Sequence, residues 1–243
     1  MLHDDELAVD VRGLRKNYGT FPALKDVSFS VRTGEVYGLI GPNGAGKTTT
    51  LRVLATLLRI SGGSVRIFGI DVEAHPEEAR KVISYLPEEA GAYKNLTGRQ
   101  YLEFIARFFA HRDMEHQMVA RGLEIVHLED RIDDKVETYS KGMMRRLLVG
   151  RALMTDPRLA ILDELTSGLD VINAQQIRRI VKDRAATGTT FLVSSHNMLE
   201  VELLCDRIAL VHDGVIVEIG TPAELKAKHH ASNIEEVFMA VAA

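Results

Sequence analysis

The sequence predicts an α/β fold in which buried parallel strands alternate with helices. Three short, almost wholly apolar runs at residues 158–163, 189–194 and 207–212 are separated by amphipathic stretches, the pattern of parallel strands covered on both faces. Two more runs, at 7–12 and 27–32, alternate apolar and polar residues, which is typical of half-buried antiparallel strands. An antiparallel β-subdomain is therefore expected near the N-terminus.

The first half of the chain is organised around one glycine-rich joint. Strand-forming residues at 35–40 lead into the stretch 41–50, and apolar residues at helical spacing follow as far as Leu58. Further strands are predicted at 64–69 and 81–87. The joint between strand and helix is where we expect the chemistry.

The middle of the chain has a different pattern. Between residues 98 and 155 apolar residues recur at helical spacing and strand signals disappear. A helical subdomain at about 89–155 is therefore expected as an insert in the α/β core. Towards the C-terminus an Asp-Gly turn at 213–214 predicts a hairpin, and the cap pattern at 221–224 predicts a helix start. No linker or internal repeat is visible, so residues 1–243 are expected to form a single domain.

The composition is that of a globular chain with little net charge. Its 243 residues are 46% hydrophobic, and 30 Lys and Arg against 34 Asp and Glu give a net charge of −4. No excess of positive charge indicates nucleic acid or anionic lipid as the main partner. The single cysteine, Cys205, fits a reducing compartment and a small buried side chain.

No membrane-crossing or secretory segment is predicted. The acidic start at residues 1–12 lacks the apolar core of a secretory signal, and no stretch approaches the ~18 apolar residues that cross a bilayer. Another polypeptide would therefore have to hold the chain at a membrane.

The stretch GPNGAGKTTT matches the phosphate-binding pattern G-x-x-x-x-G-K-S/T in full. Glycines let backbone N–H groups surround a phosphate chain, and the following helix presents its positive dipole end to the anion. Lys47 is expected to reach the β- and γ-phosphates, and the Thr48 hydroxyl to ligate Mg²⁺. A chance glycine turn is disfavoured by the strand before and the helix after. The residues predicted to bind nucleotide are Gly41, Pro42, Asn43, Gly44, Ala45, Gly46, Lys47, Thr48 and Thr49.

Polar residues follow two of the buried strands, at the sheet edge where open α/β folds bind ligands. Asp163 is suited to hold Mg²⁺ through water, and Glu164 to polarise an attacking water. His196 follows the next strand and is expected to contact the γ-phosphate and orient that water. Alone, the acidic pair could begin a helix and a lone histidine is more often structural. Beside a phosphate loop, catalytic roles for Glu164 and His196 are favoured.

With these residues in place, nearly the whole chain resembles an ATP-binding cassette (ABC) ATPase, the motor subunit of ABC transporters. The family's signature LSGGQ has a counterpart in YSKGM at 139–143, its D-loop in SGLD at 167–170, and its switch histidine in SSH at 194–196. The resemblance implies a P-loop NTPase fold with ATP and Mg²⁺ as cofactors. It also implies that Tyr18 stacks on adenine, although a tyrosine in a strand is by itself more often structural.

The resemblance further implies that ATP is held between two head-to-tail cassettes, as a homodimer or with a paired cassette. Ser140 and Gly142 of one copy would contact the γ-phosphate held by Lys47 of the other. An isolated monomer is therefore expected to hydrolyse ATP poorly. Taken alone, the segment 139–154 could be no more than a capped basic helix.

The chain departs from the family pattern at several positions. The signature has Tyr139, Lys141 and Met143 in place of leucine, glycine and glutamine, while the serine and second glycine are retained. Glu88 stands at the usual Q-loop glutamine, where its carboxylate could contact Mg²⁺ or a metal-bound water but adds a negative charge. Leu165 replaces a proline, which should alter loop rigidity more than chemistry.

These departures, with the tail at 234–241, resemble the ABC ATPases of drug, antibiotic, lipid or polysaccharide exporters, in which permease and ATPase are separate polypeptides. The resemblance implies a cytoplasmic subunit, peripheral at the inner face of the cell membrane, that touches the membrane only through transmembrane permease subunits. The segment from Glu88 into the helical insert would receive a permease helix.

Two alternatives are less well supported. A soluble ABC ATPase acting on ribosomes or nucleic acid would be expected to carry a coiled-coil insertion or a second cassette, and heptads and basic runs are absent from the sequence. A nonhydrolysing regulatory cassette is disfavoured by Glu164 and His196.

Overall fold

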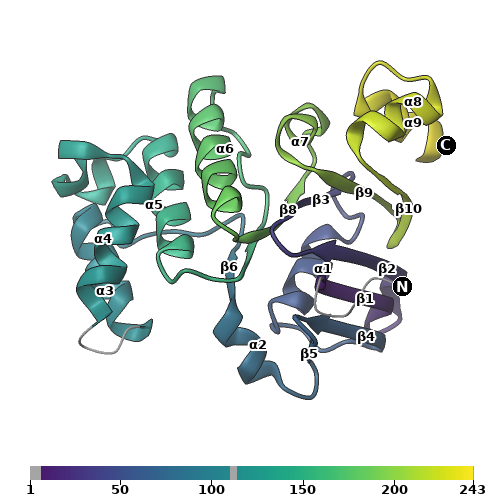
Figure 1. Ribbon diagram of the computed structural model, residues 1–243, viewed down its shortest axis with the longest axis horizontal. Helices are drawn as coiled ribbons and strands as arrows, with labels where there is room; N and C mark the ends of the chain where they lie inside the picture. The colour runs from purple at the N-terminus through teal and green to yellow at the C-terminus, as the bar shows by residue number, and fades with distance from the viewer. Residues whose placement is uncertain (1–6, 110–113, 243) are drawn as a thin grey trace.

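A continuous, curled sheet of ten strands forms the centre of the computed structural model (Figure 1), which describes residues 7–109 and 114–242. Residues 1–6 belong to the acidic start that lacks the apolar core of a secretory signal, and they lie outside the described residues. Residues 110–113 of the expected helical insert also lie outside them. The strand order is β5-β4-β1-β2-β10-β9-β3-β8-β7-β6. The strands are β1 (Leu7–Tyr18), β2 (Phe21–Arg32), β3 (Val36–Ile40), β4 (Gly62–Ile67), β5 (Ile70–Asp71), β6 (Ile83–Leu86), β7 (Leu159–Leu162), β8 (Thr190–Ser195), β9 (Arg207–His212) and β10 (Val215–Gly220).

Helices pack around this sheet and form a lobe beside it. The α-helices are α1 (Lys47–Leu54), α2 (Pro76–Val82), α3 (Gly98–Phe109), α4 (Glu115–Val126), α5 (Lys141–Leu153), α6 (Val171–Ala186), α7 (Met198–Leu204), α8 (Pro222–His229) and α9 (Ile234–Ala242). Two short 3₁₀ helices, η3 (Glu129–Asp133) and η4 (Val136–Thr138), precede α5. None of the helices in the described part of the chain is long and apolar enough to cross a bilayer.

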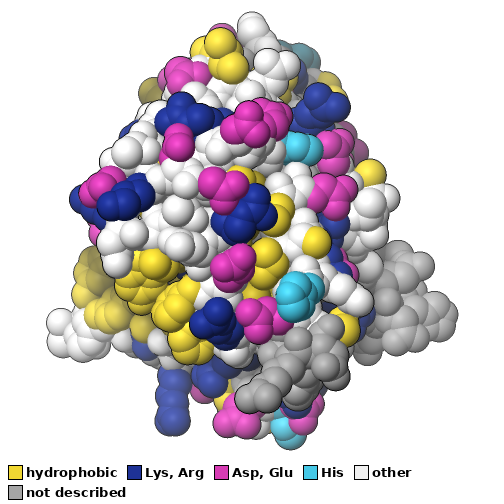
Figure 2. Space-filling view, turned by 90° about the vertical axis from the view of Figure 1, so that its left-hand side faces the viewer, with side chains coloured by type: hydrophobic (Ala, Val, Ile, Leu, Met, Phe, Trp, Pro, Cys, Tyr) yellow, Lys and Arg dark blue, Asp and Glu magenta, His cyan; other side chains and the backbone are white. Residues whose placement is uncertain are grey.

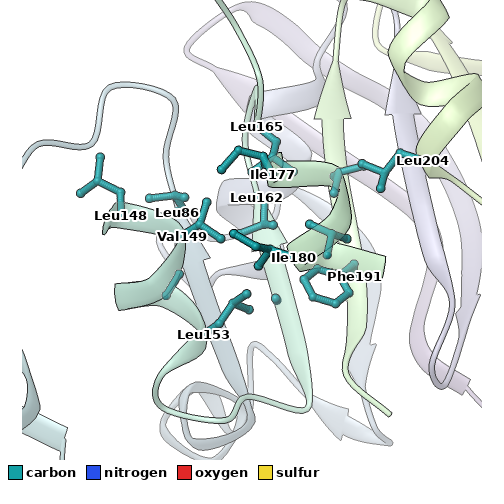
Figure 3. Packing of buried hydrophobic residues seen from close by; sticks show 14 of the residues in the cluster. Leu86, Leu148, Val149, Leu153, Leu162, Leu165, Ile177, Ile180, Phe191 and Leu204 are labelled. Carbon is teal, nitrogen blue, oxygen red and sulfur yellow. The ribbon is translucent and has the colours of Figure 1, made fainter. Parts of the chain in front are cut away.

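The expected α/β core is confirmed. Strands β6, β7, β8, β3 and β9 pair in parallel, and the three apolar runs of the sequence become β7, β8 and β9. Every residue of β7 and β8 is buried, because helices cover both faces of a parallel sheet. Side chains from α5, α6 and these strands interlock around Leu86, Leu148, Val149, Leu153, Leu162, Leu165, Ile177, Ile180, Phe191 and Leu204 (Figure 3).

The antiparallel subdomain is also confirmed, but its strands are longer than expected. β1 pairs with β2 and β4 in antiparallel fashion. The alternation ends at Gly13, which has a φ of +57° and lies at a register shift between Val11 and Leu14. Such a bulge interrupts the period of two while the strand continues, so the pattern at 7–12 underestimates β1.

The described part of the insert is mainly helical, as expected, with helices at Gly98–Phe109, Glu115–Val126 and Lys141–Leu153. In Figure 1, α3, α4 and α5 form the lobe beside the sheet. Their position brings the start of α5 and the loops after the parallel strands to the same side of the molecule, which is where the site lies.

Two element boundaries differ from expectation. The strand expected at 81–87 begins only at Ile83, because Pro76 and two acidic residues in the first turn start helix α2, which includes Lys81. The helix after the glycine-rich stretch ends at Leu54 rather than near Leu58, since the backbone turns left-handed at Thr56, with φ 59°. The C-terminal hairpin and capped helix are confirmed.

Candidate active site

The phosphate loop joins β3 to α1 and packs between strands β9 and β2. A methyl group on Gly41 would come within 2.0 Å of the Val211 carbonyl oxygen, and one on Gly46 within 2.7 Å of Leu24. Gly46 also has a φ of 108°, a conformation open mainly to glycine. Ala45 accepts a hydrogen bond from the Gly214 amide at 3.0 Å. The two glycines are therefore fixed by close packing, while Pro42, Asn43 and Gly44 form an exposed tip.

Lys47 is the buried cation of this loop, with 5% of its surface exposed. Its ammonium donates to the carbonyl oxygens of Gly41 at 2.7 Å and Pro42 at 3.1 Å, and lies 3.5 Å from a Glu164 carboxylate oxygen. The positive charge is thus held at the mouth of the loop, where a phosphate would compete for it. Thr49 follows in the first turn of α1, beside Thr48.

Asp163 and Thr48 meet as the sequence predicts. The Thr48 hydroxyl donates to Asp163 Oδ1 at 3.2 Å, and the Ser194 hydroxyl donates to the same oxygen. The Tyr85 hydroxyl lies 3.5 Å from the other oxygen, and burial, helped by Asp163, raises the pKa of Tyr85. A hydroxyl beside a carboxylate is the donor set that Mg²⁺ prefers in nucleotide sites.

Glu164 and His196 are brought into direct contact. His196 Nδ1 lies 2.8 Å from Glu164 Oε2, and the Glu164 amide donates to Ser194 Oγ at 3.0 Å. The Glu164 side chain therefore lies between Lys47 on one side and His196 on the other. A carboxylate held in this way can accept a proton from water, as catalysis of phosphoryl transfer requires.

Glu164 has an unusual backbone. Its φ is +48°, a left-handed conformation that costs roughly 1–3 kcal/mol for a residue other than glycine. The carbonyls of Asp163, Glu164 and Leu165 all accept hydrogen bonds from the buried Arg145. Charge-assisted hydrogen bonds contribute about 1.5–3 kcal/mol each, so this arginine is sufficient to offset the strain.

Ser140 and Gly142 lie at the start of α5, apart from the phosphate loop. Ser140 caps the helix by accepting from the Met143 amide at 3.2 Å, and its side chain is exposed. A methyl group on Gly142 would come within 2.1 Å of the Asn173 side chain. No hydrogen bond in the described part of the chain joins either residue to residues 41–49.

Two of the departures from the family pattern lie close together. Glu88 and Lys141 line one pocket of about 260 Å³ together with Glu164. The Glu88 carboxylate is exposed and makes no hydrogen bond or ion pair with the residues described, so the structure does not join it to Asp163. The Lys141 ammonium lies directly over Gly168 of its own chain. A methyl group added to Gly168 would come within 2.0 Å of the ammonium nitrogen.

Tyr18 ends β1 at the turn into β2, with 46% of its surface exposed. Its partner across the turn is Phe21, which is also exposed. Ala23 and Leu24, further along β2, pack against Gly46. An exposed aromatic pair therefore spans the β1–β2 turn, and β2 also borders the phosphate loop. Phe21 was not predicted.

Sequence reasoning missed three polar side chains that the structure places in the site. Ser194 is the last residue but one of β8, and its hydroxyl donates to Asp163; its position directly before Ser195 and His196 could have indicated this role. Tyr85 and Arg145 gave weaker signals. Arg145 lies three residues before the buried Leu148, but Arg146 lies three residues before the buried Val149, so this spacing does not single out Arg145.

Comparisons with known proteins agree with this geometry. The family model described as ABC transporter matches residues 24–167. The linearmycin resistance ATP-binding protein of Bacillus subtilis (strain 168) is 38% identical over 218 residues, which are 89% of this chain and 70% of that protein. The daunorubicin/doxorubicin resistance ATP-binding protein of Streptomyces peucetius is 38% identical, covering 90% of this chain and 67% of that one. The Nod factor export ATP-binding protein I of Burkholderia orbicola (strain AU 1054) is 36% identical, covering 95% and 76%.

Solved structures lead to the same family. The ATP-binding subunit of an ABC transporter superposes with a TM-score of 0.83 at 28% identity, covering 96% of this chain and 99% of that one. A nucleotide-free ATP-binding cassette superposes with a TM-score of 0.78 at 25% identity, covering 96% and 98%. The predicted fold and the predicted ATPase activity are thereby confirmed. The chain belongs to the ABC transporter family and is one of its ATP-hydrolysing, ATP-binding subunits.

Proposed function

We propose that this subunit powers the export of a small molecule through a separate transmembrane permease, at the inner face of the cell membrane. The observation that carries the ATP-driven part is the Glu164 carboxylate held between Lys47 and His196 at the mouth of the phosphate loop. The direction of transport is supported by relatives named for drug resistance and Nod factor export. ATP binding would join two cassettes and hydrolysis would release them, which passes free energy to the permease as rigid-body motion.

Thr48 and Asp163 are proposed to hold Mg²⁺. Their oxygens suit the ion, and Mg²⁺ in nucleotide sites takes its remaining ligands from phosphates and water. The ion would neutralise charge that develops on the transferred phosphoryl group. Glu88, whose carboxylate points to no partner in the described chain, is proposed to approach the metal only when nucleotide is bound.

A second copy is proposed to complete the site, with Ser140 and Gly142 reaching its bound ATP. Replacing Ser140 with arginine should lower the maximal ATPase rate by about 100-fold, because a bulky cation at this helix start blocks the partner's approach. Binding of ATP to a single chain should be unchanged, since Ser140 makes no hydrogen bond to the loop that holds the phosphates. Phosphate release and nucleotide titration measure the two effects.

Ser232→Arg is the matched control, because Ser232 lies between α8 and α9, away from helix α5, which Ser140 caps. It should hydrolyse ATP at the wild-type rate. The wild-type rate per chain should also rise with protein concentration until dimers form. A Ser140→Arg variant that keeps full turnover would contradict the shared site.

The permease is proposed to dock in a groove between the core and the helical insert. The groove has a volume of about 870 Å³ and is lined by the apolar Leu57, Ile105, Phe108, Phe109 and Met118 with the basic Arg80, Lys81 and Arg151. Apolar side chains gather along one edge of the face that the insert presents in Figure 2. An amphipathic helix with acidic residues fits this surface.

Replacing Phe108 with glutamate should weaken permease binding by at least about 30-fold, since a charge would be buried at an apolar contact. Phe108 is 70% exposed on α3, so the fold and the basal ATPase rate should stay near wild type. The measurement is co-purification, in detergent, with a multispanning membrane protein from the cells that make this chain.

Met239→Glu provides the control, because Met239 is 68% exposed on α9, away from the groove. It should co-purify like the wild type. If the wild-type chain sediments with ribosomes or nucleic acid instead of the membrane protein, the result would favour a soluble ABC ATPase and contradict the proposed role in export.

A further inference from the structure

Arg145 is a buried cation at the centre of the site, in the second turn of α5, with 8% of its surface exposed. Its guanidinium donates to four main-chain carbonyl oxygens. Nε bonds Leu165 at 2.7 Å, Nη2 bonds Glu164 at 2.6 Å and Asp163 at 2.9 Å, and Nη1 bonds Glu88 at 3.2 Å. One side chain therefore connects helix α5 to the segment that follows β7 and to the segment that follows β6.

These bonds act on the backbone that aims Glu164. Three of the four carbonyls belong to consecutive residues, 163–165, so the guanidinium fixes the peptide planes on both sides of Glu164. The left-handed φ of this residue persists only if its surroundings hold it. A planar guanidinium with donors in a rigid fork can hold several carbonyls at once, whereas a lysine ammonium presents a single point of charge.

The surroundings of Arg145 favour this role over an ordinary ion pair. All its hydrogen bonds among the described residues go to carbonyls, although the carboxylates of Glu88, Asp163 and Glu164 lie near enough to act on its charge. Burial lowers the pKa of Arg145, and those carboxylates oppose the change. The buried guanidinium of Arg145 therefore binds main-chain carbonyls and not carboxylates.

We propose that Arg145 is a positioning residue for ATP hydrolysis. It holds the loop after β7 so that the Glu164 carboxylate stays between Lys47 and His196. Because Arg145 belongs to α5, a movement of the helical insert would also move that carboxylate. The proposal rests on the catalytic role proposed for Glu164.

The test uses the whole chain with Arg145→Lys, Arg145→Met and the matched control Arg146→Lys. Arg146 is the next residue of α5, and its guanidinium donates at 2.8 Å to the His127 carbonyl, away from the site. Three quantities are measured: kcat and KM for MgATP, the dissociation constant of ATP, and backbone hydrogen exchange by segment.

Arg145→Lys should lower kcat by about 100-fold, the scale of a misplaced catalytic group, with the ATP dissociation constant within about 3-fold of wild type. Exchange should rise in residues 163–167 and in the segment around Glu88, the two places that Arg145 holds, and stay unchanged elsewhere. Arg146→Lys should change neither. Arg145→Met should lose more activity than Arg145→Lys. If the Arg145→Met variant does not fold, the result for Arg145→Lys alone tests the proposal.

Wild-type kcat in Arg145→Lys would overturn the proposal. So would a loss of kcat matched by lost ATP affinity, or by faster exchange throughout the chain, because either marks a merely structural arginine. Glu164→Gln separates the two proposals. If that variant still turns over ATP, the role of Glu164 fails; if it is inactive while Arg145→Lys is normal, only the role of Arg145 fails.

Discussion

Replacing Glu164 with glutamine is expected to stop ATP turnover while ATP binding survives. Glutamine keeps the size of the side chain but cannot take a proton from water, a loss of about 10²–10⁴-fold in rate. Lys47 would lose its carboxylate neighbour at 3.5 Å and be freer to bind phosphate. ATP affinity should therefore be equal or tighter. Phosphate release and ATP titration on the same preparation check both halves.

Glu164→Gln should also accumulate an ATP-bound dimer, because the step that separates the two copies is blocked. Size-exclusion chromatography with and without ATP measures this. Glu236→Gln, an exposed glutamate of α9, serves as the charge-matched control and should behave as wild type. Turnover within tenfold of wild type in Glu164→Gln would remove this residue from the catalytic role.

The residues that meet at the site were predictable because their spacing follows from the fold. Asp163 and His196 come directly after buried apolar runs, and parallel strands end at one sheet edge. Gly41 and Gly46 stand where the chain passes close to other backbone. The structure brings Asp163 to Thr48 and His196 to Glu164, as the sequence suggested.

Arg145 was not predictable on the same grounds. Residues of α5 are buried on nearly every side, so the helix has no single apolar stripe that would separate an inward arginine from an outward one. Its partners are main-chain carbonyls, which every residue carries. Neither periodicity nor composition could therefore distinguish Arg145 from Arg146, whose guanidinium lies at the other edge of the helix.

The fold was predicted better in its centre than at its element ends. Apolar runs located β7, β8 and β9 because burial on both faces leaves few polar residues. The full length of β1 was hidden by the bulge at Gly13. The Lys141 side chain of α5 lies close to Gly168 in the loop before α6, and a single sequence contains no signal for such a close approach.

Replacing Lys47 with methionine is expected to weaken ATP binding more than it destabilises the fold. The ammonium makes charge-assisted hydrogen bonds, and losing one such bond to a phosphate, at about 1.5–3 kcal/mol, weakens affinity by about 10–100-fold. Breaking a buried ion pair can cost about 3–5 kcal/mol when the other charge is left alone. Here Glu164 keeps His196 at 2.8 Å, so the loss of stability should be smaller.

Thermal unfolding with and without MgATP separates the two effects. ATP should raise the unfolding temperature of the wild-type protein, whereas the rise in Lys47→Met should be much smaller because its affinity for ATP is lower. Lys228→Met, which loses the ion pair between the exposed Lys228 of α8 and Glu218 of β10, should keep the full ATP-induced shift. An unchanged shift in Lys47→Met would mean that the phosphates bind elsewhere, because no other cation of the described chain bonds the carbonyls of Gly41 and Pro42 at the mouth of this loop.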